Sequence, residues 1–529
     1  MSQPDRSPLH QIARAAGTVM SAYILVQIAG LVRGILIYRA FGTSSELDSF
    51  NAANRVAELL FNLMAGGALG SAFIPTFTGL LAKENRQRAW QLASAIATLL
   101  FGVLSLICLV VFIFAPQVVR HGLFILSPER SIGQEDMTVS LLRLLLPTVV
   151  IFGLSGLVMG ILNAHQRFWL PALAPAMYSL GQIGGVLFLP AGMGIYRLAA
   201  GALIGSLLHL LVQFPDLLKL GGRFKPMIGL DMPEVREVGK LMAPRVLGAA
   251  VVQINFIVNT VLALSLAEGS VSAVTLAFTW MLMPQAIIAQ SIAIAALPTF
   301  SAQVALGKLD ELRSSLAGAL RGVIFLSLPA AVGLILIRTP LIRFLYEGGS
   351  FTARSTEMVT WALLWYAVGL PAHCLLEVLV RAFYALHDTR TPVGVGVAAM
   401  ALNIALSFLF TGLFARIGWM PHGGLALANS LATLLEMLTL LIWLRKRLQG
   451  LEGRRVLGAL LSASAGSLVL AGGITLFLRW TSLPDVLHIA GSAVLGLGVY
   501  GVLLIVLQVP ETHTLRRAVL QKVPFLHRR

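Results

Sequence analysis

Three arginines lie inside or beside long apolar stretches of this sequence, where ionisable side chains are costly and usually serve a function. Arg33 lies well inside the apolar stretch 17–41, whereas Arg55 and Arg245 lie near the starts of two later stretches. A guanidinium group presents a planar fork of N–H donors that matches two phosphate oxygens. We therefore expect a cavity that binds an anionic substrate, for which a lipid-linked diphosphate is a natural candidate.

Other polar side chains in the apolar stretches occur in pairs at helical spacing. Arg55 and Glu58 are three residues apart, and Asn255 and Asn259 are four apart, so each pair shares one helix face. The first pair is equally consistent with a structural ion pair. The asparagines either line a wet cleft or hydrogen-bond to neighbouring helices, and the sequence leaves both interpretations open.

Two later stretches also carry ionisable residues. Glu377 and Arg381 are four residues apart, a spacing more typical of helix support than of a binding site. Glu436 lies in the apolar stretch 422–444.

The sequence contains no motif for catalysis. A Walker A lysine loop, a G-x-S-x-G nucleophile turn and an H-E-x-x-H zinc motif are all absent from it. Cys108 and Cys374 both lie inside apolar stretches, without the spacing of a disulfide framework or a metal site. We therefore expect a protein that is not an enzyme and that uses no metal and no cofactor.

The composition is that of a membrane protein. The 529 residues are 57% hydrophobic and only 12% charged, which is about half the charged fraction of a soluble domain. This excludes a soluble enzyme. A net charge of +16 would suggest nucleic acid as a partner of a soluble protein. Because cytoplasmic loops of membrane proteins are rich in lysine and arginine, we expect membrane lipid around this chain and no nucleic-acid partner.

Fourteen windows are apolar over about 20 residues, the length that an α-helix needs to cross a bilayer. They predict an all-α polytopic membrane protein. The windows are 17–41, 54–81, 89–115, 138–162, 170–190, 195–218, 238–265, 271–297, 315–337, 357–385, 392–414, 422–444, 456–478 and 486–508. If the N-terminus is cytoplasmic, both tails and every second loop receive most of the basic residues, which predicts that both termini lie in the cytoplasm.

Two short motifs recur along the chain at nearly the same offset. Pro75 of Ile-Pro-Thr-Phe recurs as Pro298 of Leu-Pro-Thr-Phe, 223 residues later, and His165 recurs as His387, 222 residues later. Both motifs occupy equivalent positions in units of six spans. An even number of spans predicts two parallel repeats, which form two lobes around a central cleft in many transporters. The predicted parts are an N-terminal lobe at 1–220, a C-terminal lobe at 221–450 and an extra helical pair with a basic tail at 451–529.

Several segments together carry a resemblance to a known family. They are Gly30-Leu31-Val32-Arg33, Phe41-Gly42 with Asp48-Ser49-Phe50, Gly67-Ala68 with Ala72-Phe73-Ile74-Pro75, Gly160 to Ala164 with Arg167-Phe168, and Phe383-Tyr384-Ala385 with Asp388 to Pro392. Through them, over roughly residues 17–450, the chain resembles the MurJ/MviN lipid II flippases. That family belongs to the multidrug/oligosaccharidyl-lipid/polysaccharide (MOP) exporter superfamily.

The resemblance implies a flippase of the bacterial inner membrane. Such a protein moves lipid II, the undecaprenyl-pyrophosphate-linked peptidoglycan precursor, from the inner to the outer leaflet by alternating access. It also implies that cavity arginines hold the diphosphate and that the last two helices form a groove for the polyprenyl tail. Arg33 matches one such arginine, and Asp48 matches an acidic residue of the family. The expected substrate-binding residues are Arg33, Asp48, Arg55, Asn62, Arg245, Asn255 and Asn259.

The sequence departs from the family at several cavity positions. In place of the arginines, or of one acidic residue, that the family often has, it carries Gln27, Phe61, Asn62, Gly66 and either Thr279 or Trp280. The cavity is therefore expected to be less basic than in a typical member. Either Arg55 and Arg245 substitute from neighbouring turns, or the substrate differs.

Two other classes of function are consistent with the sequence. One is a different MOP exporter, which moves a lipid-linked oligosaccharide or a drug cation. The other is a membrane scaffold for cell-wall enzymes that transports nothing. A cation exporter predicts carboxylates at the midplane in place of Arg33, and a scaffold predicts no continuous polar cleft. The sequence leaves open whether a coupling ion is used.

Overall fold

The computed structural model describes residues 8–64, 68–127 and 132–506, and these segments are helical almost throughout. Ten of the described helices are long and apolar enough to cross a membrane. Over the residues that the structure describes, each of the fourteen predicted windows lies on one helix or on consecutive helical segments. The structure therefore confirms the all-α polytopic fold.

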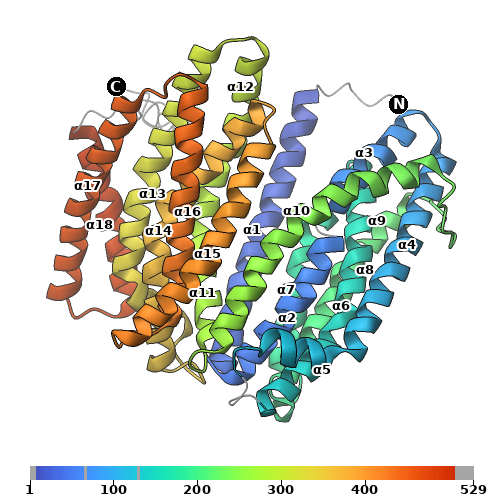
Figure 1. Cartoon of the computed structure of the whole chain (residues 1–529), viewed down its shortest axis with the longest axis horizontal. Coiled ribbons are helices and arrows are strands. Elements are labelled where there is room, and N and C mark those ends of the chain that lie inside the picture. Colours follow the sequence, from blue (N-terminus) through green and yellow to red (C-terminus); the bar gives the residue numbers. More distant parts are fainter. Residues whose placement is uncertain (1–7, 65–67, 128–131, 507–529) are drawn as a thin grey trace, which may run out of the picture. The chain divides into compact units, whose positions relative to one another are not determined.

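Contacts between helices divide the chain into two compact units, residues 1–272 with 348–352 and residues 273–347 with 353–529. The first unit contains α1 (Pro8–Phe41), α2 (Ser45–Met64), α3 (Ala68–Ala82), α4 (Arg86–Ile113), α5 (Ala115–Val118), α6 (Ile132–Ala164), α7 (Trp169–Phe188), α8 (Tyr196–Leu211), α9 (Phe214–Lys219) and α10 (Pro233–Leu264) (Figure 1). The second contains α12 (Ser291–Ala305), α13 (Leu309–Tyr346), α14 (Ala353–Ala385), α15 (Arg390–Arg416), α16 (His422–Arg447), α17 (Gly453–Trp480) and α18 (Asp485–Val506). Helix α11 (Ser270–Gln285) begins in the first unit and continues in the second.

Helix α10 belongs to the first unit because it packs against α2 and α3. This grouping reflects packing, whereas the predicted lobes at 1–220 and 221–450 describe a sequence duplication. The lobe boundaries therefore stay a prediction.

Some predicted windows extend over more than one helix. The window 54–81 covers α2 and α3, and residues 65–67 between them lie outside the described residues. The window 271–297 covers α11, a π-helical turn at Ala286–Gln290 and α12. This turn follows Pro284, which has no N–H to donate within a helix. Apolar windows alone do not reveal such breaks, because hydropathy is insensitive to the hydrogen-bond pattern.

Helices α7 and α8 pack closely through glycines. A methyl group at Gly181 would lie 2.2 Å from the Cα atom of Gly205, and one at Gly185 would lie 2.6 Å from the Cα atom of Gly201. Since lipid supplies no hydrophobic drive for helix association, such small-residue contacts between backbones are a main source of packing energy in membranes.

The two repeated motifs end their helices in the same way. After Pro75 the N–H of Asn85 donates to the carbonyl of Leu80, with Glu84 in a left-handed conformation (φ 56°). After Pro298 the same pattern is formed 223 residues later, where the N–H of Lys308 donates to Gln303 and the left-handed residue is Gly307 (φ 70°). Both are Schellman-type helix ends.

The histidine motif repeats in the same manner, but with an offset of 221. The N–H of Arg167 donates to Leu162 after left-handed Gln166, and that of Asp388 donates to Phe383 after left-handed His387. His387 is therefore equivalent to Gln166, and the sequence match of the two histidines is displaced by one residue. The shared helix ends support the duplication independently of residue identity.

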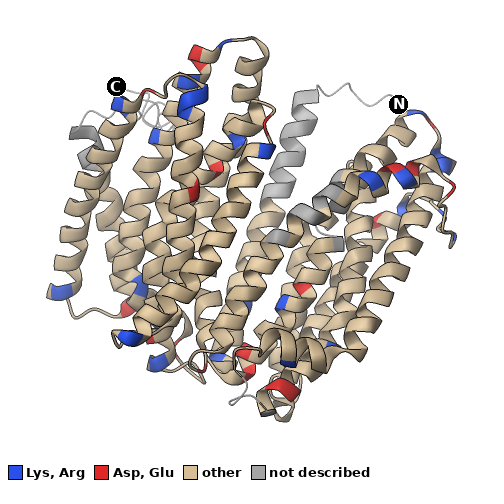
Figure 2. Ribbon diagram, viewed as in Figure 1, with Lys and Arg blue, Asp and Glu red and all other residues tan. Residues whose placement is uncertain are grey.

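Charged residues lie mostly toward the ends of the helices, and the middle stretches of the ribbon are largely uncharged (Figure 2). Helix α16 ends with Arg445, Lys446 and Arg447 in its last turn. Arg454 follows at the start of α17. This is the charge pattern expected at a cytoplasmic membrane surface.

The two ends of α17 provide a test of the predicted orientation. Arg454 and Arg479 are both exposed and are 25 residues apart, which corresponds to about 37 Å at a rise of 1.5 Å per residue. In a chain whose native cysteines have been replaced, we expect a cysteine at Arg479 to react with an impermeant thiol reagent in intact cells. A cysteine at Arg454 should react only after the cells are opened. The reverse pattern would refute cytoplasmic termini.

The glycine contact between α7 and α8 predicts a selective loss of stability. Gly181→Ala forces the two backbones apart and should destabilise the protein by roughly 1–3 kcal/mol, measured as a lower apparent Tm in detergent. Gly184→Ala on the same helix is the matched control, because its methyl group would meet no atom closer than 3.9 Å. Equal Tm changes in the two variants would contradict the proposed packing.

Candidate functional site

Arg33 lies on α1, which packs along α7 in the first unit. Arg33 and Glu58 of α2 both lie close enough to the hydroxyl of the half-buried Tyr178 on α7 to act on it electrostatically. The amide of Gln182 donates a hydrogen bond of 3.1 Å to that same hydroxyl. Side chains of α1, α2 and α7 thus form one polar neighbourhood among apolar helices.

The half-buried Arg33 guanidinium has no carboxylate within ion-pair distance among the residues that the structure describes. A guanidinium inside a membrane protein carries a large desolvation cost unless an anion offsets it. The group is therefore chemically suited to an anionic ligand.

Arg55 is already engaged. Its Nη1 lies 2.8 Å from Oε2 of Glu58, and its guanidinium lies 4.9 Å from the centre of the Phe256 ring on α10. Asn54 donates to the other Glu58 oxygen at 3.0 Å. Of the two interpretations left open by the sequence, the structural ion pair is the one formed here, and the cation–π contact joins α2 to α10.

The polar residues of α10 interact along their own helix. The side-chain amide of Asn259 donates to the carbonyl oxygen of Asn255 at 3.0 Å and to its side-chain oxygen at 3.2 Å. Asn255 is buried, and Asn259 is half-buried. Arg245 lies in α10, but its side chain is outside the described residues.

Asn62 lies half-buried on α2. The ring of its neighbour Phe61 packs against Phe152 of α6, with ring centres 5.7 Å apart. This end of α2 therefore presents an aromatic contact and one amide where the family often has two arginines.

Asp48 is only 3% exposed, and both of its carboxylate oxygens accept hydrogen bonds at the start of α11. Its Oδ1 accepts from the backbone N–H of Ser272 at 2.8 Å and from the Ser272 hydroxyl at 2.6 Å. Its Oδ2 accepts from the backbone N–H of Gly269 at 2.8 Å. The first N–H groups of a helix have no partner within that helix and carry partial positive charge, so a carboxylate is a favourable cap.

Two more side chains converge on Ser272. The hydroxyl of Tyr38 on α1 donates to its carbonyl at 2.9 Å, and the amide of Asn51 on α2 donates to its hydroxyl at 3.1 Å. The cluster of Tyr38, Asp48, Asn51 and Ser272 thus holds α1 and α2 to the start of α11. Sequence analysis identified Asp48 but missed its partner Ser272, because residues 224 positions apart give no local signal.

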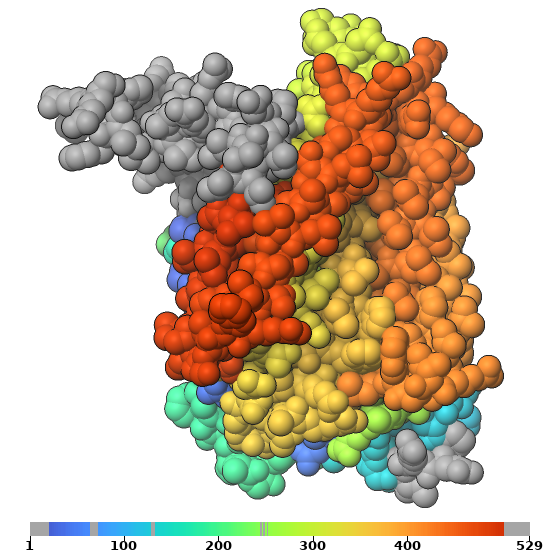
Figure 3. All heavy atoms as spheres, turned by 90° about the vertical axis from the view of Figure 1, so that its left-hand side faces the viewer, coloured from blue at the N-terminus to red at the C-terminus, as the bar shows by residue number. Residues whose placement is uncertain are grey.

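An apolar groove of about 580 Å³ lies in the second unit, lined by residues of α13, α14, α16 and α17. Helices α13 and α17 meet beside it through Ile324, Phe325, Ala459 and Ala463. Figure 3 shows this face, with α17 and α18 in red and α13 in yellow. Arg445, in the last turn of α16, is the one charged residue among the described residues that line the groove. An apolar channel of this kind is suited to a hydrocarbon chain.

The described residues contain no cluster of three or more metal-ligating side chains.

The fold and these surfaces define a class of protein, a multi-spanning helical membrane transporter. It has a basic polar site and an apolar groove, the two features that an amphiphilic anion needs. The family model described as lipid II flippase MurJ matches residues 37–489. The chain belongs to the MurJ lipid II flippase family.

Comparison with individual proteins agrees with this assignment. The lipid II flippase MurJ of Burkholderia cenocepacia is 32% identical over 443 residues, which cover 82% of this chain and 84% of that protein. A solved structure of lipid II flippase MurJ in an inward closed conformation has a TM-score of 0.77 at 25% identity, covering 92% of this chain and 97% of that one.

A multidrug resistance MATE family transporter of the MOP superfamily, solved in an inward-facing conformation, has a TM-score of 0.66. It is 16% identical, and the match covers 83% of this chain and 99% of that one, so it supports the shared fold alone.

The hydrogen bonds of Asp48 predict a specific loss of stability. Asp48→Asn keeps the size of the side chain but replaces one acceptor oxygen with an NH₂ group that meets an N–H donor. The lost hydrogen bond should lower the free energy of unfolding by roughly 1–3 kcal/mol. We expect a lower apparent Tm in detergent. Glu268→Gln is the control, because this exposed side chain also accepts a backbone hydrogen bond, from Ser45 at 2.8 Å, and glutamine retains that acceptor. If Asp48→Asn were as stable as the control, the capping role would be wrong.

Proposed function

We propose that this chain flips lipid II, moving the undecaprenyl-diphosphate-linked peptidoglycan precursor from the inner to the outer leaflet of the bacterial inner membrane. The observation that carries this proposal most directly is the match to the lipid II flippase family over residues 37–489. The chemistry of the two surfaces agrees with it, because lipid II has an anionic diphosphate and a long apolar tail.

In this proposal Arg33 binds the diphosphate. Its fork can donate to two phosphate oxygens at once, and no described carboxylate competes for it. Arg55 is held by Glu58 at 2.8 Å, so it becomes available to the substrate only if that ion pair opens. Asn62, Arg245, Asn255 and Asn259 are proposed as further polar contacts with the head group.

The apolar groove of about 580 Å³ is proposed to hold the polyprenyl tail. Its walls are mainly leucine, isoleucine, valine and alanine, and Arg445 lies at its end, in the last turn of α16. Helix α17 supplies one wall, whereas no described residue of α18 lines the groove. Both termini are proposed to be cytoplasmic, in keeping with the basic end of α16.

We propose Asp48 as a positioning residue instead of a direct ligand of the anion. Its carboxylate is buried and has three hydrogen-bond donors in this conformation. Because α11 continues from Ser272 into the second unit, release of these hydrogen bonds would free the start of that helix. Making and breaking this cap is the step that we assign to alternating access.

The test is complementation of a bacterium depleted of its own lipid II flippase, together with measurement of lipid II exposed on the outer leaflet. The unaltered chain should restore growth and exposure. Arg33→Ala should lower the flipping rate by roughly tenfold or more, the effect of losing a charge-assisted bidentate contact. The flipping rate of Arg33→Lys should lie between those of the unaltered chain and Arg33→Ala, because lysine keeps the positive charge but lacks the forked guanidinium.

Arg39→Ala is the control on the same helix, since Arg39 is exposed near the membrane edge. All variants are compared at equal membrane level. Full flipping by Arg33→Ala would overturn the diphosphate contact, whereas failure of the unaltered chain to complement would overturn the proposed substrate.

A further inference from the structure

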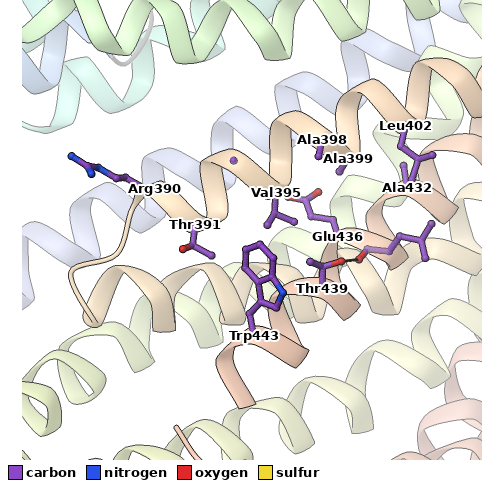
Figure 4. Close-up of a pocket in the computed structure, with 12 residues that line it drawn as sticks. Arg390, Thr391, Val395, Ala398, Ala399, Leu402, Ala432, Glu436, Thr439 and Trp443 are labelled. Atoms are coloured by element: carbon purple, nitrogen blue, oxygen red, sulfur yellow. Dashed lines mark hydrogen bonds between the residues drawn. The ribbon is translucent and has the colours of Figure 1, made fainter. Parts of the chain in front are cut away.

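A second groove, of about 490 Å³, lies between α15 and α16 of the second unit (Figure 4). On the α15 side it is lined largely by small residues, including Gly394, Ala398 and Ala399. On the α16 side it is lined by Ala432, Leu435, Glu436, Thr439 and Trp443. The volume falls within the range of small-molecule sites, about 300–1,000 Å³.

This groove is distinct from the one proposed for the polyprenyl tail, although α16 borders both. The tail groove uses Leu431, Leu434, Leu438 and Arg445, whereas the second groove uses Glu436, Thr439 and Trp443. Residues three, four and seven apart share a helix face, so the two sets lie on different faces of α16.

Glu436 is the one carboxylate among the described residues that line the second groove. Its Oε1 atom would lie only 3.3 Å from a methyl group at Gly396, so the side chain extends across to α15. It has no hydrogen-bond donor and no ion-pair partner among the described residues. Arg390 lies at one end of the groove with its guanidinium directed away from Glu436 (Figure 4).

Glu436 also lies deep in the apolar part of the chain. It precedes Arg445, in the basic last turn of α16, by nine residues, or about 13 Å along the helix. Ionisation of a carboxyl group among apolar walls at this depth is costly unless a positive charge pairs with it. The described residues provide no such charge, so a cationic ligand is the partner that would stabilise the ionised form of Glu436.

The surroundings of Glu436 fit an organic cation better than a metal ion. Hard metal cations need about six oxygen ligands, and the described lining offers only the hydroxyls of Thr391 and Thr439 in addition to Glu436. In contrast, one carboxylate in an apolar groove that also contains an indole ring matches an ammonium or phosphonium group on an apolar body.

We propose that the groove between α15 and α16 binds an amphiphilic organic cation, whose charge pairs with Glu436 and whose apolar body lies along Ala398 and Trp443. This site is additional to the flippase site and does not depend on it. It gives lipophilic cations a defined place to bind on a protein whose proposed substrate is an anion.

The test uses a pair of probes of the same shape and opposite charge, tetraphenylphosphonium and tetraphenylborate. Equilibrium binding of each is measured on the purified full-length protein in lipid nanodiscs, with empty nanodiscs subtracted. We expect saturable binding of the cation and none of the anion. Glu436→Gln keeps the shape of the side chain and should weaken cation binding by roughly tenfold or more, as expected for loss of a desolvated charge partner.

Two variants of α15 test the location independently of the carboxylate. A side chain at Gly394 would enter the groove, where its Cβ atom meets nothing within 4 Å, so Gly394→Leu should block binding without overpacking. Gly412→Leu is the control, because Gly412 is equally open and lies on α15 outside the groove.

Glu357→Gln removes an exposed carboxylate on α14 and controls for the change in charge. Full cation binding by either Glu436→Gln or Gly394→Leu would overturn the proposal, as would equal binding of the two probes. Loss of cation binding in Glu436→Gln and Gly394→Leu would support the proposal, provided that Gly412→Leu and Glu357→Gln still bind the cation.

Discussion

The cost of placing a charge among apolar helices is the constraint on which the rest of this structure depends. In the membrane interior water cannot solvate a side chain, so each ionised group needs a partner within the protein or from a ligand. Asp48 meets this need with three donors at the start of α11. Arg55 meets it with Glu58 and the face of Phe256. These satisfied charges join helices, and their chemistry is already used within the fold.

The same constraint explains how the helices pack and end. Backbone groups must be hydrogen-bonded inside the chain. The repeated Schellman-type ends at Glu84 and Gly307 supply N–H donors to carbonyls that have no other partner within their helices. Between helices, van der Waals contact replaces the hydrophobic effect, which is why Gly181 approaches the backbone of Gly205 so closely. The proposed sites accordingly involve polar groups that have no partner among the described residues.

The sequence was sufficient for the part of the fold that follows from local chemistry. Apolar length predicted windows that lie on the described helices, and the duplicated motifs predicted equivalent positions, at which the structure has the same helix ends. What could not be predicted depends on tertiary packing. No local pattern links Asp48 to Ser272, 224 residues away, or groups α10 with α2 and α3. The alignment of His165 with His387 was wrong by one residue, because the left-handed position requires a backbone conformation that different residue types can adopt.

For the candidate site, sequence spacing located the charges but not their partners. In the sequence Arg33 and Arg55 are both intramembrane arginines, and only the structure shows that they differ in their ion-pair partners. Arg55 forms an ion pair with a carboxylate one turn away, whereas Arg33 has no described carboxylate within ion-pair distance. Glu436, the isolated acidic residue of its span, lies in a groove of its own.

Arg33 and Glu436, neither of which has an ion-pair partner among the described residues, have opposite signs and occupy different units of the chain. A guanidinium selects against cations, and a carboxylate among apolar walls selects against anions, since like charges brought together in a medium of low dielectric constant repel strongly. A substrate held at Arg33 by its diphosphate would therefore be repelled from the groove of Glu436, and a lipophilic cation would be repelled from the site of Arg33. If both proposals hold, one membrane protein binds an anionic lipid and a cationic amphiphile without competition for the same charge.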